Sequence, residues 1–170
     1  TASTVDPAGL ALKTAVRYEQ PGATGWLRRE GRTLPAGTTT GAPATAETKT
    51  VYYGDTDTAP AVCGIPAGTK QYGFTKMVTG PSPSIGTAVV TEYAYDSWGR
   101  TVATKISGDT AWSCTAFDAR GRTTQQVVAG PSGTTTRTVA TTYTPTVTGA
   151  KVETADGAVA GSPNGAKLTT

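Results

Sequence analysis

The sequence predicts an all-β protein built from antiparallel hairpins, and three observations lead to this class. Residues 95–100 (YDSWGR) return 22 residues later as residues 117–122 (FDARGR). Side chains on both sides of each copy alternate as they do in strands. Thr is the most frequent residue, and its branched Cβ favours extended backbone. A fixed period of this kind is typical of repeat units that stack on their neighbours.

The first copy is predicted to be a strand, a tight turn and a strand. Residues 89–95 and 101–106 are the two strands. Asp96 can accept a hydrogen bond from a backbone N–H two residues later, and Gly99 can adopt the positive φ that other residues resist. The second copy repeats this plan, and Gly108-Asp109 supplies the return turn of an antiparallel meander. The predicted turn residues are Tyr95, Asp96, Gly99, Arg100, Phe117, Asp118, Gly121 and Arg122.

Other segments echo the unit more faintly. Residues 5–10 carry an Asp and a Gly at the same separation and precede an alternating run to Tyr18, which indicates a degenerate copy with Leu10 in place of Arg. Residues 33–48 and 54–62 have little apolar periodicity and are predicted to be loops.

The C-terminal residues 149–170 are small and polar, and we expect them either to fray or to pair with a strand outside this chain. No separate second domain is expected. Residues 1–170 are therefore predicted to form one repeat segment of a longer array, with the clearest repeats at 89–130.

Composition excludes several function classes. The hydrophobic fraction is 36%, below the roughly 45–50% of globular domains, so we expect a sheet with one modest apolar face. The chain has no His, which rules out Ser-His-Asp and Cys-His nucleophiles and histidine metal sites. Asp96 and Asp118 could stack as a glycosidase pair, but a turn-capping role is favoured. We expect no catalytic residue, no cofactor, no metal and no enzyme activity.

Net charge and hydropathy limit the partners. The formal charge is only +3, so nucleic-acid binding is not expected. No apolar run reaches the roughly 18 residues that cross a bilayer, so no membrane span is expected.

The Tyr-Asp-x-x-Gly-Arg signature at 95–100, with its copy at 117–122, resembles the YD repeat of the rearrangement hotspot (Rhs) superfamily. That superfamily includes wall-associated bacterial proteins, polymorphic toxins and the teneurin ectodomain. The resemblance implies a curved β-sheet that spirals into a hollow shell, often around a toxic C-terminal domain. Thr144, where an Asp would follow Tyr143, departs from the pattern.

Asp6-Pro7-Ala8-Gly9-Leu10 allows two interpretations. It is similar to the Asp-Pro-x-Gly-Leu motif at the end of the Rhs core, near which such proteins cleave themselves. Because the YD copies follow it rather than precede it, a variant repeat turn in which Pro7 presets φ is favoured.

The two cysteines, Cys63 and Cys114, match no zinc or redox spacing. They leave a choice between one disulfide and two buried thiols, of which the disulfide is favoured.

A second group of residues could contact a ligand. Trp26 lies beside Arg28 and Arg29, a combination that can bind phosphates, sulfated glycans or sugar rings, although a solvated strand end is favoured. Trp98 could stack on a sugar or pack on an adjacent coil, and packing is favoured. Trp112 is expected in the packing layer of the sheet.

These observations predict a structural segment of a secreted or cell-surface YD-repeat protein. Its expected partners are flanking repeats or domains of the same polypeptide, with an enclosed toxin domain and surface glycans as further candidates. The alternative is an extracellular carbohydrate-binding or adhesion module that uses Trp26, Trp98 and nearby cations. A toxin tip is the least favoured class.

Overall fold

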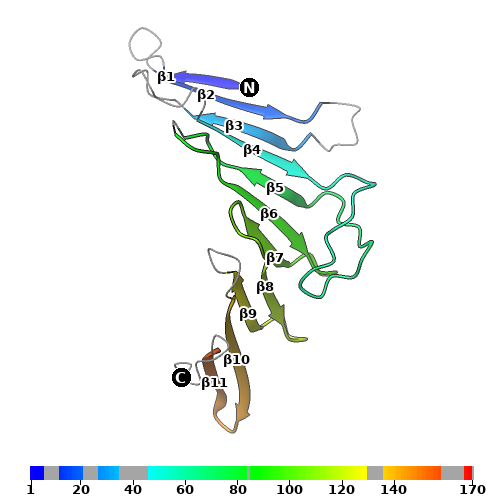
Figure 1. The fold of residues 1–170 in the computed structure, drawn as a ribbon, viewed down its shortest axis with the longest axis vertical. Coiled ribbons are helices and arrows are strands. Elements are labelled where there is room, and N and C mark those ends of the chain that lie inside the picture. Colours follow the sequence, from blue (N-terminus) through cyan, green and yellow to red (C-terminus); the bar gives the residue numbers. More distant parts are fainter. Residues whose placement is uncertain are drawn as a thin grey trace. The chain divides into compact units, whose positions relative to one another are not determined.

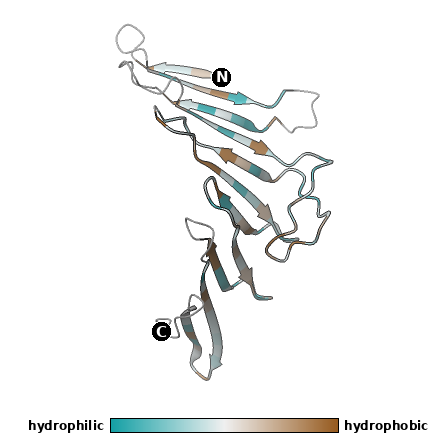
Figure 2. Ribbon diagram, in the orientation of Figure 1, coloured by the Kyte–Doolittle hydropathy of each residue, from teal (hydrophilic) through white to brown (hydrophobic). Residues whose placement is uncertain are grey.

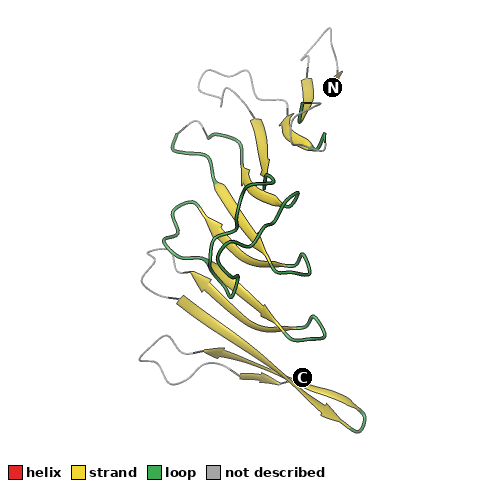
Figure 3. Cartoon of the chain, turned by 90° about the vertical axis from the view of Figure 1, so that its right-hand side faces the viewer, coloured by secondary structure: helices red, strands yellow, loops and turns green. Residues whose placement is uncertain are grey.

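The structure is a computed structural model of the chain. It describes residues 1–5, 12–20, 27–34, 46–83, 85–129, 136–157 and 167–169. These residues contain strands, turns and loops but no helix (Figure 3). Accordingly, no described helix has the length and apolarity needed to cross a membrane.

The strands are hydrogen-bonded in chain order, each to the next (Figure 1). Antiparallel pairing confirms the predicted all-β, antiparallel class. The strands are β1 (Ala2–Val5), β2 (Leu12–Tyr18), β3 (Arg29–Leu34), β4 (Ala46–Tyr52), β5 (Thr75–Thr79), β6 (Val90–Tyr95), β7 (Thr101–Ile106), β8 (Ser113–Phe117), β9 (Thr123–Ala129), β10 (Thr136–Thr146), β11 (Gly149–Gly157) and β12 (Lys167–Thr169).

The strands of the two clear repeats lie where the alternating side chains predicted them. β6 and β7 flank the first turn, and β8 and β9 flank the second. The return turn also forms, because Gly108 has φ 99° and the N–H of Asp109 donates to the carbonyl of Ile106 at 2.9 Å. The strand predicted to end at Tyr18 is β2.

One of the two predicted loops is partly wrong. Thr33 pairs with Glu47 and Leu34 with Ala46, so both ends of residues 33–48 belong to the hairpin of β3 and β4. Their Thr and Ala side chains weaken the apolar period without preventing a ladder of backbone hydrogen bonds. The middle of that stretch, 35–45, lies outside the described residues.

The second predicted loop, 54–62, contains no strand. It has one isolated bridge, between Thr58 and Lys70. At the C-terminal end, β11 pairs with β10 and with β12, so its described partners lie inside this chain.

The chain divides into two compact units. Unit 1 comprises residues 1–59 and 67–93, and unit 2 comprises 60–66 and 94–170. That both belong to a single repeat segment stays a prediction.

Few side chains in either unit are buried. Among the described residues, the buried side chains of unit 1 are Tyr53, Ala59 and the polar Gln71, and the buried apolar side chains of unit 2 are Ile65, Ala94, Val102 and Ala103. Polar and apolar residues follow one another along single strands (Figure 2). Backbone pairing and local turn contacts therefore contribute much of the order in each unit.

Candidate functional site: acid–arginine turns

The turn between β6 and β7 is organised by the carboxylate of Asp96. Its Oδ1 accepts hydrogen bonds from the backbone N–H groups of Trp98 and Arg100, both at 2.9 Å. Its Oδ2 accepts from Nε of Arg100 at 2.6 Å. The backbone closes the turn as well, because the N–H of Asp96 donates to the carbonyl of Arg100 and the N–H of Gly99 to that of Asp96, both at 3.0 Å. One acid thus fixes both the turn and the arginine side chain.

The turn between β8 and β9 repeats this arrangement bond for bond. Asp118 accepts from the N–H groups of Arg120 and Arg122, both at 2.9 Å, and from Nε of Arg122 at 2.8 Å. Gly121 has φ 78°, the same value as Gly99. The positive φ expected at both glycines is present, so the two sequence copies are also two structural copies.

The surroundings of the two acids favour their charged form. At Asp96, burial opposes ionisation, but hydrogen bonds from the backbone and side chain of Arg100 and from the N–H of Trp98 outweigh it and lower the pKa. At Asp118, the backbone N–H of Arg122 is the main cause of a lowered pKa. Both carboxylates are therefore hydrogen-bond acceptors at neutral pH.

This pKa shift predicts acid sensitivity. A carboxyl whose pKa is lower in the folded than in the unfolded state stabilises the fold above its ordinary value, 3.8, and loses that contribution as pH falls through the folded value. Urea unfolding would be measured at intervals of about one pH unit from pH 7 to pH 2. The free energy of unfolding should decrease once the pH is lower than about 4. The double variant Asp96→Asn, Asp118→Asn should give a flatter curve there, and equal slopes in both proteins would contradict the assignment.

The arginines that close these two turns, Arg100 and Arg122, also contact the aromatic ring that opens the next repeat along the chain. The guanidinium of Arg100 lies over the ring of Phe117, 4.4 Å from its centroid, and that of Arg122 lies over Tyr143 at 4.1 Å. The hydroxyl of Tyr143 donates to the carbonyl of Thr123 at 3.1 Å. A cation held by its own acid therefore stacks on the following ring, and this contact links successive hairpins.

A third turn of this type lies between β2 and β3, where the sequence shows no YD motif. The N–H of Glu19 donates to the carbonyl of Arg28 at 2.9 Å, and Glu19 Oε2 accepts from the N–H and Nε of Arg28 at 3.1 and 3.0 Å. Leu27, at the position of Gly99, has φ 54°. Arg28 lies 4.0 Å from the ring centroid of Tyr52, whose hydroxyl donates to the carbonyl of Arg29 at 2.9 Å. Glu19 and Arg28 thus take the roles of acid and arginine.

A fourth turn, between β4 and β5, keeps the backbone pattern without the acid or the arginine. The N–H of Tyr53 donates to the carbonyl of Phe74 at 2.9 Å, and the N–H of Gly73 donates to that of Tyr53 at 3.1 Å. Gly73 has φ 90°. Arg28 reaches this turn through Nη1, which donates to the carbonyl of Gly73 at 2.9 Å. Residues 54–73 are therefore an insertion. They replace the three residues that separate the acid from the arginine in the turns at Asp96 and Asp118.

A register shift marks the same point in three of the four hairpins. It falls between Arg17 and Tyr18, between Val51 and Tyr52, and between Ala116 and Phe117. In each, the aromatic residue pairs with the residue that follows the turn's last position: Tyr18 with Arg29, Tyr52 with Thr75, and Phe117 with Thr123. The recurring bulge is independent evidence that these hairpins are copies of one unit.

The sequence motif did not reveal these two further copies. In the third turn the acid is Glu, the glycine is Leu27, and the acid and arginine stand nine positions apart rather than four. In the fourth, Tyr53 and Phe74 replace the acid and the arginine. The available signal was an aromatic residue at the end of an alternating strand, as at Tyr18 and Tyr52.

The structure describes three of the four candidate ligand contacts, Arg28, Arg29 and Trp98. Trp26 and the Asp6–Leu10 motif lie outside the described residues. Arg28 is engaged by Glu19 and Tyr52, and Arg29 is exposed in β3. Trp98 belongs to unit 2, is 77% exposed, and stacks on Arg100 at 4.7 Å. Its ring is therefore not packed into the described chain, whereas Trp112 is half-buried.

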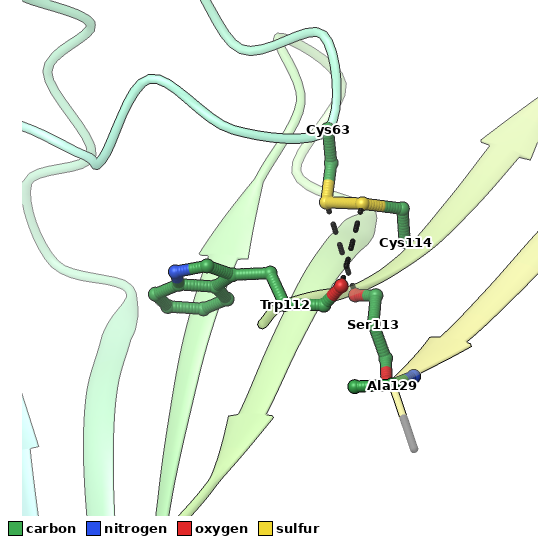
Figure 4. Close-up of a disulfide and its surroundings, with 5 residues drawn as sticks. All are labelled: Cys63, Trp112, Ser113, Cys114 and Ala129. Atoms are coloured by element: carbon green, nitrogen blue, oxygen red, sulfur yellow. Dashed lines mark hydrogen bonds between the residues drawn. A yellow bond between two sulfur atoms is a disulfide. The ribbon is translucent and has the colours of Figure 1, made fainter. Parts of the chain in front are cut away.

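The cysteines are joined. Cys63 and Cys114 form a disulfide with Cα atoms 5.3 Å apart (Figure 4). Cys63 Sγ lies 3.8 Å from the carbonyl oxygen of Ser113, and Cys114 Sγ lies 3.9 Å from that of Trp112. This bond connects the insertion 54–73 to β8. Among the described residues, no cluster of three acids or cysteines could hold a metal ion.

Comparisons of the chain with protein-family models, with curated proteins and with solved structures found no match.

Proposed function

We propose that this chain is a structural segment of a secreted or surface-delivered YD-repeat protein, in which it forms part of a curved shell or stalk. The observation that supports this most is the recurrence of one turn-closing backbone hydrogen bond at four places in the described chain, with a bulge beside three of them. When the same turn recurs, its stabilising contacts are spread along the sheet, and no single hairpin has a distinct chemical role. Flanking repeats and an enclosed C-terminal domain are the partners proposed for such a segment.

The state of the two repeat acids supports a structural rather than a catalytic role. A glycosidase needs one carboxyl with a raised pKa to donate a proton. Asp96 and Asp118 have lowered pKa values, and each is bound by its own arginine. We assign no catalytic residue.

Duplicating one repeat tests the proposal. A second copy of residues 96–117, with Ser in place of its cysteine, would be inserted after Phe117, so that its aromatic end again precedes an Asp. If the hairpins are equivalent units, the longer protein should show more β signal by circular dichroism and one cooperative unfolding transition at or above the original temperature. An insert of the same composition in scrambled order is the matched control. Rapid proteolysis confined to the true copy would contradict the proposal.

Trp98 supports a second candidate function, an extracellular carbohydrate-binding or adhesion module. The hydrogen bonds of the turn use only the backbone N–H of this residue, and the equivalent position of the second turn is Arg120, whose N–H makes the same bond. The fold therefore does not require an indole at this place, and exposed indoles can stack on sugar rings. A glycan array should detect saturable binding that Trp98→Arg abolishes, and the absence of any bound glycan would reject this candidate.

A further inference from the structure

The insertion 54–73 is divided between the two units. Its tip, residues 60–66, groups with unit 2, whereas the residues on both sides of the tip group with unit 1. The bond from Cys63 to Cys114 joins the tip to β8 within unit 2. The tip thus has a covalent link to β8.

Little apolar surface of the tip is buried. Ile65 is its one buried side chain, at 7% exposed, while Ala61, Gly64 and Pro66 are exposed. Two of its hydrogen bonds are internal, from the N–H of Val62 to the carbonyl of Pro60 and from the N–H of Ile65 to that of Val62. A segment with little buried apolar surface opens more readily than a paired strand.

The backbone at the cysteine is also constrained. Cys63 has φ 52° and is followed by Gly64 with φ 80°. Residues other than Gly, Asn and Asp rarely adopt this left-handed region, and such conformations persist where the surroundings enforce them. The disulfide is the strongest local constraint, so breaking it removes much of what holds Cys63 in this conformation. Both cysteines are only half-buried, which leaves the bond within reach of a small thiol.

We propose that the Cys63–Cys114 disulfide is a reducible staple, which a low-molecular-weight thiol opens to release residues 60–66 from β8 while the paired strands stay in place. A thiolate attacks one of the two sulfurs, the Cys63–Cys114 bond breaks, and a mixed disulfide forms with the small thiol. A second thiol molecule displaces the first as an oxidised dimer, and both cysteines end as protein thiols. Two electrons pass from the small thiol to the protein.

The acid–arginine turns explain why the strands would survive this step. The turns at Asp96 and Asp118 contain no cysteine and depend on hydrogen bonds and arginine–ring contacts. β8 stays paired with β9 through the backbone of Cys114 to Phe117. The chain would therefore hold the tip in an oxidising compartment and release it in a reducing one.

Hydrogen–deuterium exchange read by mass spectrometry tests this on the whole chain, in about 10 mM reduced glutathione and in its absence. On reduction we expect the amides of 61–65 to exchange at least about tenfold faster, and those of β9 and β10 to keep their rates. The Cys63→Ser variant, which cannot form the disulfide, should match the reduced protein even without glutathione. Three results would overturn the proposal: a disulfide that stays intact in glutathione, a tip whose exchange does not change on reduction, or an equal acceleration across β9 and β10.

Discussion

Replacing Gly121 with Val is expected to lower the free energy of unfolding by roughly 1–3 kcal/mol, because the backbone there must hold a positive φ that a β-branched residue resists. The φ of Gly121 is 78°. Space is not the cause, since a Cβ at Gly121 would lie 3.6 Å from Arg100 Nη1, an ordinary contact distance. Gly99 has the same φ, so Gly99→Val should cost a similar amount. Urea denaturation followed by circular dichroism would measure both.

Ala119→Val is the matched control for the glycine variants. It adds the same branched side chain to the same turn at an exposed position that is not among the described residues with positive φ. Its effect should stay within about 0.5 kcal/mol. Glycine variants as stable as this control would contradict the assigned turn geometry.

Asp96→Ala is expected to cost roughly 2–3 kcal/mol, because the carboxylate accepts three hydrogen bonds, one of them from a charged group. Its side chain is 16% exposed and that of Arg100 is 27% exposed, so water replaces these bonds only in part. Loss of the acid also frees the guanidinium that stacks on Phe117. Chemical denaturation at neutral pH would measure the loss.

Asp109→Ala is the control for this variant. Asp109 also lies in a turn, but the hydrogen bond that it accepts from the N–H of Ile106 is long, at 3.4 Å. Its removal should change stability by no more than about 0.5 kcal/mol. If Asp96→Ala were equally mild, the acid would not organise its turn.

The sequence predicted the parts of the fold in which local chemistry decides the structure. At Asp96 and Gly99, a side-chain acceptor and a positive φ are both needed within a few residues, so the motif identifies the turn. The alternating residues of β6 and β7 similarly identify the strands. The hydrogen-bonded order of these strands follows because short turns join neighbours.

The remaining copies could not be found in this way because their turns are long. Once 54–73 is inserted, the acid is no longer needed to close a tight turn, and Tyr53 takes its place with its ring buried and its hydroxyl donating to the carbonyl of Tyr93 at 2.8 Å. Leu27 adopts a positive φ, which a leucine in the sequence does not predict. The arginine–ring contacts were also missed, since they join residues that the sequence keeps far apart, such as Arg28 and Tyr52.

The most direct test of the central claim, that the arginine of one repeat stabilises the chain by stacking on the ring of the next, is a double-mutant cycle on Arg122 and Tyr143. Unfolding free energies of Arg122→Ala, Tyr143→Ala and the double variant give the coupling. Arg122 and Tyr52 are the reference pair, because the ring of Tyr52 stacks with Arg28. We predict a favourable coupling of about 0.5–2 kcal/mol for Arg122 with Tyr143 and none for the reference pair. A coupling of zero between Arg122 and Tyr143 would contradict the claim.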